Sequence, residues 1–290
     1  TNATLLTNDV IEELYKNHIG IGISIDGDRK CHDLQRTFVS GKGSYDTVKK
    51  NLLQAQRYYK NKIGTITTIT KQTAVHIEKI IEHLVLDLHI SNIKLNFVHA
   101  STYTHGQNQC LNTQEIADTE LRILYKIIEL QERGYDVMEH NIFIKLKNLL
   151  FREYADICLS CGCCGGKKMI VFDMDGNIYP CELTDDASFV IGSIYKKESL
   201  IEQIKMTIDK DKAFFKMKKA VECEKCYWKF FCRGGCTVRA LSEKRQMEVI
   251  DIDHIECAIN QVLYPALMEL VLRKPHIVNQ MLGEDLLVDE

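Results

Sequence analysis

The chain has 290 residues, of which 45% are hydrophobic and 27% are charged, with a net charge of −3. This length predicts about two domains, and the slightly acidic balance without a long basic run argues against a nucleic-acid partner. The first residues lack the basic and apolar regions of a signal peptide, and no apolar stretch reaches the length of a membrane span. We therefore expect a cytoplasmic protein without a membrane partner.

The first 150 residues alternate between strand-like and helix-like patterns. Apolar, β-branched runs predict strands at residues 19–26, from residue 63 and at 92–98. Helical spacing predicts helices after Ser44, at about 73–86 and at 114–133, the last capped by Asn112 or Thr113. This order is typical of the α/β class with a parallel sheet, in which functional residues gather at the C-terminal ends of strands.

The pattern changes after residue 150. The segment 167–182 predicts two short strands joined at Asp175-Gly176, which is a strong hairpin signal. Helices are expected near residues 198–208, 213–220 and 255–272, with a cysteine-rich loop before the last of them. We see no repeat or flexible linker.

Ten of the twelve cysteines lie between residues 158 and 257. In a reducing compartment this density indicates metal or cluster ligation rather than disulfides. Cys223, Cys226, Cys232 and Cys236 form C-x2-C-x5-C-x3-C, in which Arg233-Gly234-Gly235 supplies backbone amides for a cluster. On this loop alone, a zinc site and an iron–sulfur site remain about equally favoured.

The wider pattern of an upstream cysteine, G-x4-C ending at Cys181, the loop and a final Cys257 resembles the SPASM module of radical SAM enzymes. The N-terminal segments TNATLL, ISIDG, HDLQR and GKGSYDTV resemble the same superfamily. The resemblance implies a partial (β/α) radical SAM-type barrel at residues 1–150, followed by a SPASM domain of a β-hairpin plus helices at 151–290.

The resemblance implies two auxiliary [4Fe–4S] clusters. Cys223, Cys226, Cys232 and Cys257 would hold the distal cluster, and Cys181 and Cys236 would hold the nearer one with an upstream pair. The candidates for that pair are Cys158, Cys161, Cys163 and Cys164. The C-x5-C spacing of Cys158 and Cys164 matches sulfatase-maturase-like members, whereas a gapless alignment of the glycine-rich segment favours Cys163. Cys31 and Cys110 stand alone and are expected to be core residues.

Three further residues acquire roles by the same resemblance. Ser24 and Arg36 would lie near the S-adenosylmethionine pocket. Glu182 follows Cys181 at the place where sulfatase-maturase-like relatives have a proposed base, and a carboxylate beside buried clusters suits that role. Each has a simpler alternative. The Asp-Gly that follows Ser24 would be only a turn, Arg36 would be a surface charge, and Glu182 would be a solvated hairpin residue. The C-x3-C-x2-C triplet that holds the catalytic cluster does not occur in this sequence, and N-terminal truncation is the simplest explanation.

The function expected is that of the C-terminal part of a radical SAM maturase, an oxidoreductase that modifies a peptide or protein by a thioether crosslink or side-chain oxidation. S-adenosylmethionine and a third [4Fe–4S] cluster would bind only the intact protein, and this piece alone should not cleave S-adenosylmethionine. The unusual CGCC segment favours a ribosomal-peptide maturase. A peptide substrate, possibly rich in cysteine, and a ferredoxin or flavodoxin reductant are the expected partners. The alternatives are a non-catalytic iron–sulfur electron-transfer or binding module, and a zinc-stabilised scaffold.

Overall fold

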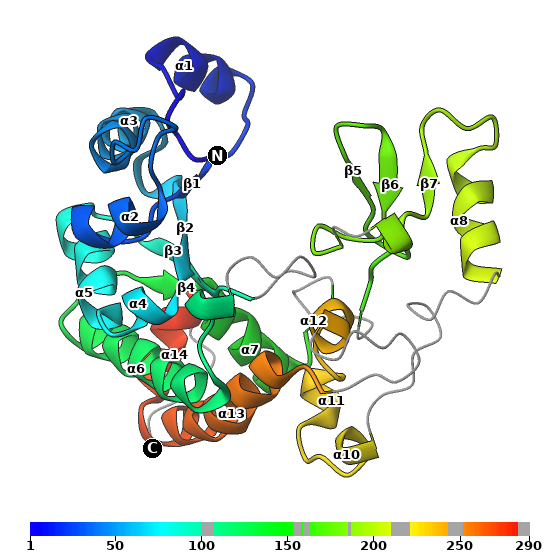
Figure 1. The fold of residues 1–290 in the computed structure, drawn as a ribbon. Helices are drawn as coiled ribbons and strands as arrows, with labels where there is room; N and C mark the ends of the chain where they lie inside the picture. The colour runs from blue at the N-terminus through cyan, green and yellow to red at the C-terminus, as the bar shows by residue number, and fades with distance from the viewer. Residues whose placement is uncertain are drawn as a thin grey trace. The chain divides into compact units, whose positions relative to one another are not determined.

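The computed structural model describes residues 1–99, 107–153, 158, 163–184, 187–209, 221–242 and 252–283. The chain forms two compact units (Figure 1). Unit 1 consists of residues 1–98, 109–146 and the chain from 262 onward, and unit 2 is built mainly of residues 147–261. These limits differ from the expected division at 150/151, because the chain from residue 262 onward returns to the first unit while the start of α13 (His254–Arg273) stays with the cysteine-rich one.

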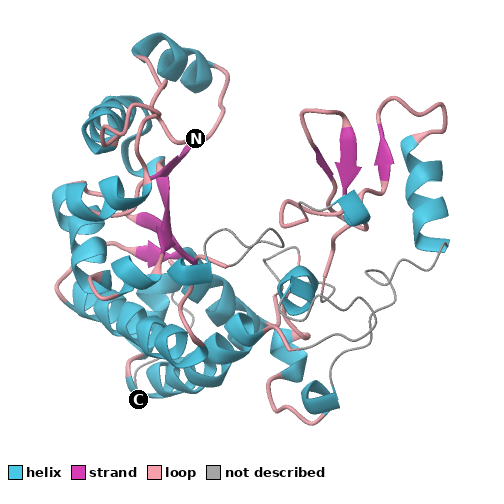
Figure 2. Cartoon of the chain, in the orientation of Figure 1, coloured by secondary structure: helices cyan, strands magenta, loops and turns pink. Residues whose placement is uncertain are grey.

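Unit 1 contains a four-stranded parallel sheet, as the alternating pattern predicted. The strands are β1 (Gly22–Ser24), β2 (Gly64–Ile69), β3 (Asn92–Phe97) and β4 (Met138–Glu139), in the order β1-β2-β3-β4. The register places Ser24 opposite Ile66 and Phe97 opposite Ile69. Figure 2 shows these strands in magenta with helices beside them. Parallel pairing brings the C-terminal strand ends to one edge, where ligands usually bind in such sheets.

Helices connect and cover the strands of unit 1. They are α1 (Asn8–Lys16), α2 (Arg29–Gln35), α3 (Tyr45–Tyr59), α4 (Lys71–Ala74), α5 (Ile77–Glu82), α6 (Thr113–Glu132), α7 (His140–Phe151), α13 (His254–Arg273) and α14 (Pro275–Leu282). Short helical turns are η1 (Lys60–Lys62), η2 (His83–Asp87) and η3 (Gln107–Gln109). The helix expected at 73–86 is instead split into α4, α5 and the π-helical η2, with a break at His76, whose φ and ψ are −109° and 16°. A Thr70–Thr73 capping box marks the start of α4.

The best-formed helix end confirms the capping signal read from the sequence. Asn112 Oδ1 accepts a hydrogen bond from the Glu115 backbone N–H at 2.9 Å, and the Asn112 N–H donates to Glu115 Oε2 at 2.8 Å. This capping box satisfies backbone donors at the start of α6. Along α6, Ile116, Ile123 and Ile127 are buried at helical spacing and form part of the core of unit 1.

Among the described residues, α13 is long and apolar enough by length and composition to cross a membrane. Its Leu263, Tyr264 and Leu267 are nevertheless fully buried within the protein. These residues pack on one side of the helix, and 33% of its apolar window is buried within the protein.

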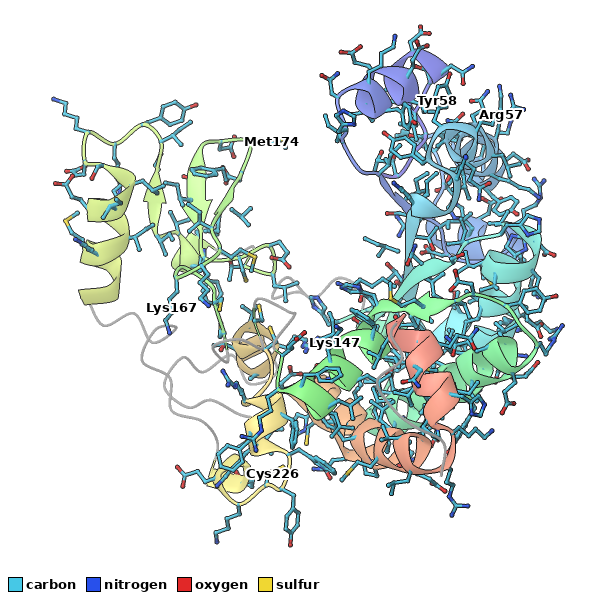
Figure 3. All side chains as sticks on the ribbon, turned by 180° about the vertical axis from the view of Figure 1, so that it is seen from behind. Arg57, Tyr58, Lys147, Lys167, Met174 and Cys226 are labelled. Atoms are coloured by element: carbon cyan, nitrogen blue, oxygen red, sulfur yellow. The ribbon has the colours of Figure 1, made fainter. Side chains whose placement is uncertain are left out.

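Unit 2 begins with the predicted hairpin. Strands β5 (Val171–Phe172) and β6 (Asn177–Tyr179) are antiparallel, and β7 (Gly192–Ser193), which the sequence did not indicate, adds a third strand. The turn needs Gly176, because its φ is +75° and a Cβ there would lie 2.7 Å from Ile194 and Tyr195. Met174, labelled in Figure 3, is fully exposed at the turn.

The other elements of unit 2 are short. They are η4 (Ala187–Phe189), α8 (Leu200–Asp209), α10 (Val221–Glu224), α11 (Lys229–Cys232) and α12 (Thr237–Ser242). The predicted helix at 198–208 corresponds to α8, whereas the one expected at 213–220 lies outside the described residues.

Candidate functional site

The cysteine loop is a chain of tight turns. The Cys226 N–H donates to the Cys223 carbonyl at 3.3 Å, which brings the first pair close together. After Cys232 closes α11, the backbone of residues 233–235 has φ values of +53°, +90° and +69°. Two of these three left-handed positions are glycines, which adopt that conformation without strain. The run reverses the chain so that Cys236 starts in a new direction at the head of α12.

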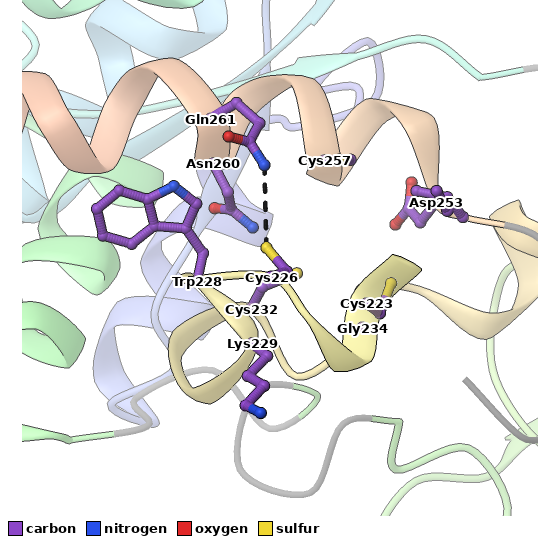
Figure 4. A pocket seen from close by; sticks show the side chains of 11 residues that line it. Cys223, Cys226, Trp228, Lys229, Cys232, Gly234, Asp253, Cys257, Asn260 and Gln261 are labelled. Atoms are coloured by element: carbon purple, nitrogen blue, oxygen red, sulfur yellow. Dashed lines mark hydrogen bonds between the residues drawn. The ribbon is translucent and has the colours of Figure 1, made fainter. Parts of the chain in front are cut away.

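Four of the predicted ligands surround one cavity, which we call the four-cysteine cavity (Figure 4). Its walls include Cys223, Cys226, Cys232 and Cys257, together with Trp228, Asp253, Asn260 and Gln261. The structure thus gathers the expected distal-cluster cysteines, although Cys257 lies 21 residues after Cys236, the last cysteine of the loop. Gln261 Nε2 donates to Cys226 Sγ at 3.9 Å, so α13 contributes an amide donor as well as a thiol.

The four thiols can be compared with the needs of a zinc ion and of an iron–sulfur cluster. Among the described residues, no three His, Cys, Asp or Glu side chains are close enough to hold one metal ion. Zinc–sulfur bonds of about 2.3 Å would require the sulfurs to lie roughly 3.8 Å apart. In a [4Fe–4S] cluster each thiolate binds a different iron, and the sulfurs are correspondingly more separated. Four thiols around one cavity are the donor set that a [4Fe–4S] cluster uses.

A second set, the three-cysteine group, consists of Cys163, Cys181 and Cys236. Cys181 is buried with Phe189 and Val238, and Cys163 and Cys236 pack against this core. Burial raises the pKa of the Cys181 thiol to about 11, and the neighbouring sulfurs of Cys236 and Cys163 act in the same direction. Burial also raises the pKa of Cys236, while Arg239 opposes that effect. Such thiols bind iron with release of a proton.

The four upstream candidates are distinguished by where they lie. Cys163 belongs to the three-cysteine group, Cys158 is half-buried, and Cys161 lies outside the described residues. Cys164 is fully buried and forms a disulfide, so its sulfur is not a ligand unless that bond is reduced. Cys163, which the gapless alignment favoured, thus lies beside Cys181 and Cys236, and Cys158 remains a candidate for the upstream pair.

Glu182 lies on the turn that follows Cys181. This turn is fixed by Thr184, whose Oγ1 donates to the Cys181 carbonyl at 2.6 Å. The Glu182 side chain is exposed. The carboxylate therefore follows the buried Cys181 but is itself open to solvent.

Arg36 and Ser24 lie at the C-terminal edge of the sheet in unit 1. Arg36 Nε donates to Asp26 Oδ2 at 2.6 Å, and the Thr68 N–H donates to Asp26 Oδ1 at 2.9 Å. Asp26 is completely buried, so the guanidinium is the counter-charge of a buried carboxylate. Ser24 is half-buried at the end of β1, two residues before this ion pair. The sequence indicated Asp26 as part of a strand end, but not its ion pair with Arg36.

His32 belongs to the same network. Its Nδ1 accepts a hydrogen bond from the Asp26 N–H at 3.2 Å, so Nε2 carries the proton and donates to Ser44 Oγ at 3.0 Å. Ser44 Oγ in turn donates to the Arg36 carbonyl at 2.8 Å. Burial lowers the pKa of His32. The motif residues around 26–44 thus form one connected structure that holds Arg36 in place.

The sequence patterns missed one pair in unit 2. Asp253 is almost completely buried, and both its side chain and that of Arg239 lie beside the cysteine sites. Asp253 precedes α13 at the position of a helix cap, which is the one local signal that marks it. The contact of Asp253 with Cys236 in the cysteine loop is made by tertiary structure, so the local sequence does not indicate it.

Comparison with known proteins finds anaerobic sulfatase-maturating enzymes among the relatives. No protein-family model matches the chain. A cysteine-type anaerobic sulfatase-maturating enzyme of Clostridium novyi is 26% identical over 239 residues, covering 81% of this chain and 62% of the relative. A second, from Clostridium perfringens, is 23% identical, with 81% and 63% covered. The chain thus spans less than two thirds of the length of these relatives.

Solved structures give the fold. The structure of native anSMEcpe with bound AdoMet and Cp18Cys peptide aligns with a TM-score of 0.78 at 20% identity, covering 93% of this chain and 74% of that one. Streptococcus suis SuiB bound to S-adenosylmethionine aligns with a TM-score of 0.57 at 17% identity, covering 88% and 58%. The mixed α/β fold with a parallel sheet and a C-terminal unit is therefore that of these proteins. The chain is related to the anaerobic sulfatase-maturating enzymes, and its resemblance to radical SAM enzymes with a SPASM module is confirmed.

Proposed function

We propose that this chain is part of a radical SAM maturase that modifies a peptide or protein, and that unit 2 holds two auxiliary [4Fe–4S] clusters. The observation that supports this most is the sorting of the unit 2 cysteines into two separate sites. Cys223, Cys226, Cys232 and Cys257 face one cavity, while Cys163, Cys181 and Cys236 share one core. The same seven positions were candidates from the family pattern.

The chain's own residues have distinct tasks in this proposal. The four-cysteine cavity provides a complete set of thiolates. The three-cysteine group provides three, and Cys158 or another upstream cysteine completes it. When bound, the clusters would accept an electron or bind a substrate thiol. Glu182, exposed beside Cys181, would take a proton from the substrate.

The region around Ser24 and Arg36 would face S-adenosylmethionine in the intact protein. The Asp26 carboxylate fixes Arg36 through a hydrogen bond of 2.6 Å, so the guanidinium is held at the edge of the sheet rather than in solvent. The third [4Fe–4S] cluster, which would cleave S-adenosylmethionine, requires the C-x3-C-x2-C motif that this sequence does not contain. We place the intact enzyme in the cytoplasm, with a ferredoxin or flavodoxin as its reductant.

The substrate class is a peptide or protein, possibly one that contains cysteine. The names of the curated relatives favour side-chain oxidation of the sulfatase-maturating type over a thioether crosslink. The lower TM-score to SuiB points the same way. The CGCC segment by itself favours a ribosomal-peptide maturase, but the similarity to sulfatase-maturating enzymes extends over 239 residues, so we favour the sulfatase-maturating type.

A zinc-stabilised scaffold is the second candidate, since thiolates also bind zinc. Metal analysis separates the two. The chain would be produced and purified without oxygen, and its iron, sulfide and zinc measured. Two four-iron clusters predict about eight irons per chain, and Cys226→Ser should remove about half of them. Cys110→Ser is the matched control, because Cys110 belongs to neither site. Zinc in place of iron, or no metal at all, would overturn the proposal.

If the protein binds iron but does not modify a peptide, a non-catalytic electron-transfer module would be favoured instead. That possibility is tested on the intact protein, with S-adenosylmethionine, a reductant and a cysteine-containing peptide. A change in the mass of the peptide is the expected result. An unchanged peptide despite cleavage of S-adenosylmethionine would count against this substrate class.

A further inference from the structure

One buried carboxylate connects the two cysteine sites of unit 2. Asp253 Oδ2 accepts a hydrogen bond of 2.7 Å from the backbone N–H of Cys236, a member of the three-cysteine group. The Asp253 backbone carbonyl accepts one of 2.8 Å from the N–H of Cys257, whose side chain lines the four-cysteine cavity. The same residue therefore holds the backbone of one ligand from each set.

The second carboxylate oxygen caps a helix. Asp253 Oδ1 accepts from the Glu256 N–H at 3.1 Å, at the start of α13. This is a helix N-cap interaction, and it fixes the first turn of the helix that carries Cys257. The side chain that binds the Cys236 backbone thus also fixes the helical turn from which the Cys257 side chain projects.

Arg239 supplies the counter-charge. Its Nε and Nη2 donate to Asp253 Oδ2 at 3.0 and 2.7 Å, and Nη2 also lies 3.3 Å from Glu256 Oε2. Asp253 is 2% exposed, so its charge requires such a partner. Arg239 lies on α12, the helix that begins directly after Cys236. The position of the guanidinium is therefore tied to the position of Cys236.

The glycine pair of the loop fits this arrangement. A Cβ at Gly235 would lie 2.7 Å from Asp253 Oδ2, so a side chain there would displace the carboxylate. Glycine at this position thus permits the approach of Asp253 as well as the left-handed turn before Cys236.

We propose that Asp253 is a positioning residue shared by the two cluster sites, held in place by Arg239. This inference rests on the proposed function. Hydrogen bonds and charges around cluster ligands set both the ligand geometry and the reduction potential. A substitution of Asp253 should therefore alter both clusters, although its carboxylate binds iron in neither of them.

Two substitutions separate the two contacts of Asp253. Asp253→Ser keeps a helix cap, since serine caps well, but its hydroxyl is too short to reach Cys236 and Arg239. Asp253→Ala loses the cap as well. Asp173→Ser is the matched control, because Asp173 accepts backbone N–H groups of Asp175 and Asn177 in the hairpin turn at 2.9 and 2.7 Å.

The measurements are iron and sulfide per chain and the paramagnetic resonance signals of the reduced clusters, on anaerobically prepared chain. In Asp253→Ser we expect iron to fall by about half, with the signal of the four-cysteine site retained. In Asp253→Ala we expect both signals to change, whereas Asp173→Ser should match the parent. Hydrogen exchange in α13 checks that the helix cap is kept in the serine variant.

Failure of this inference can be told apart from failure of the proposed function. If the parent chain binds two clusters and Asp253→Ser keeps both with unchanged signals, the shared role is refuted and the clusters stand. If the parent chain binds no iron, both are refuted. Should the Asp253 variants not fold, Arg239→Lys replaces them, because lysine keeps the charge but cannot donate from two nitrogens. We expect it to shift the signal of the three-cysteine site, and an unchanged signal would overturn the inference.

Discussion

Glu139 makes the stability of unit 1 depend on pH in a defined direction. The carboxylate ends β4 and is 3% exposed. Its two oxygens accept from the Leu95 N–H at 2.9 Å and the Ile142 N–H at 2.8 Å. Burial raises the pKa of Glu139 to about 7, although these backbone donors lower it. The group is thus partly protonated near neutral pH.

The magnitude follows from the two pKa values. An unfolded chain has a glutamate pKa of 4.5, and the folded value is about 7. Between these values the folded state binds more protons, so the contribution is complete below pH 4.5 and is lost as the pH rises through about 7. At 1.36 kcal/mol for each pH unit, the loss is about 3 kcal/mol. Glu139→Gln cannot ionise and removes this dependence.

The assay is amide hydrogen exchange of α6, which reports on unit 1, compared between the parent and Glu139→Gln from pH 4.5 to 8. His32 titrates with the opposite sign, because burial lowers its pKa, but it is present in both proteins and cancels in the difference. Glu12→Gln on the exposed face of α1 is the control. If the stability difference between parent and Glu139→Gln stays constant within about 1 kcal/mol over this range, the reasoning is wrong.

Three other predictions concern the sites. Arg36→Met should destabilise unit 1 by roughly 3 kcal/mol, because it leaves the buried Asp26 carboxylate without its cation. Hydrogen exchange measures this loss of stability. An equal loss in Arg57→Met, at an exposed arginine, would contradict the prediction. Cys163→Ala should lower bound iron by about half, while Cys31→Ala retains it; undiminished iron would remove Cys163 from the ligands. In the intact enzyme, Glu182→Gln should slow peptide modification by about 10²- to 10⁴-fold without loss of iron, and unchanged turnover would exclude it as the base.

The sequence was sufficient where local pattern and structure coincide. The runs around β2 and β3 are apolar and β-branched, and Asn112 with Glu115 is a complete local cap, so these elements could be predicted. The strand β7 could not, because it has two residues, Gly192 and Ser193, and exists through its pairing with β6. The early start of α4 likewise depends on the Thr70–Thr73 contact.

The site was predictable in its chemistry but only partly in its geometry. Cysteine spacing and the family pattern named Cys223, Cys226, Cys232 and Cys257 as one set, and the structure brings these four around one cavity. Among Cys158, Cys163 and Cys164, by contrast, spacing gave no decision, because the choice depends on how the backbone approaches Cys181. The Asp253–Arg239 ion pair joins positions 14 residues apart through tertiary structure, and no local rule indicates it.

The wall of the four-cysteine cavity contains Trp228, the only tryptophan of the chain. Its indole lies beside the thiols, with the Phe231 ring 6.1 Å away between centroids. The chain therefore has an intrinsic optical reporter at one of its two cysteine sites. Bound iron and sulfide would absorb near its emission and quench it, so cluster assembly at this site could be followed by fluorescence in unlabelled protein, without contribution from another tryptophan.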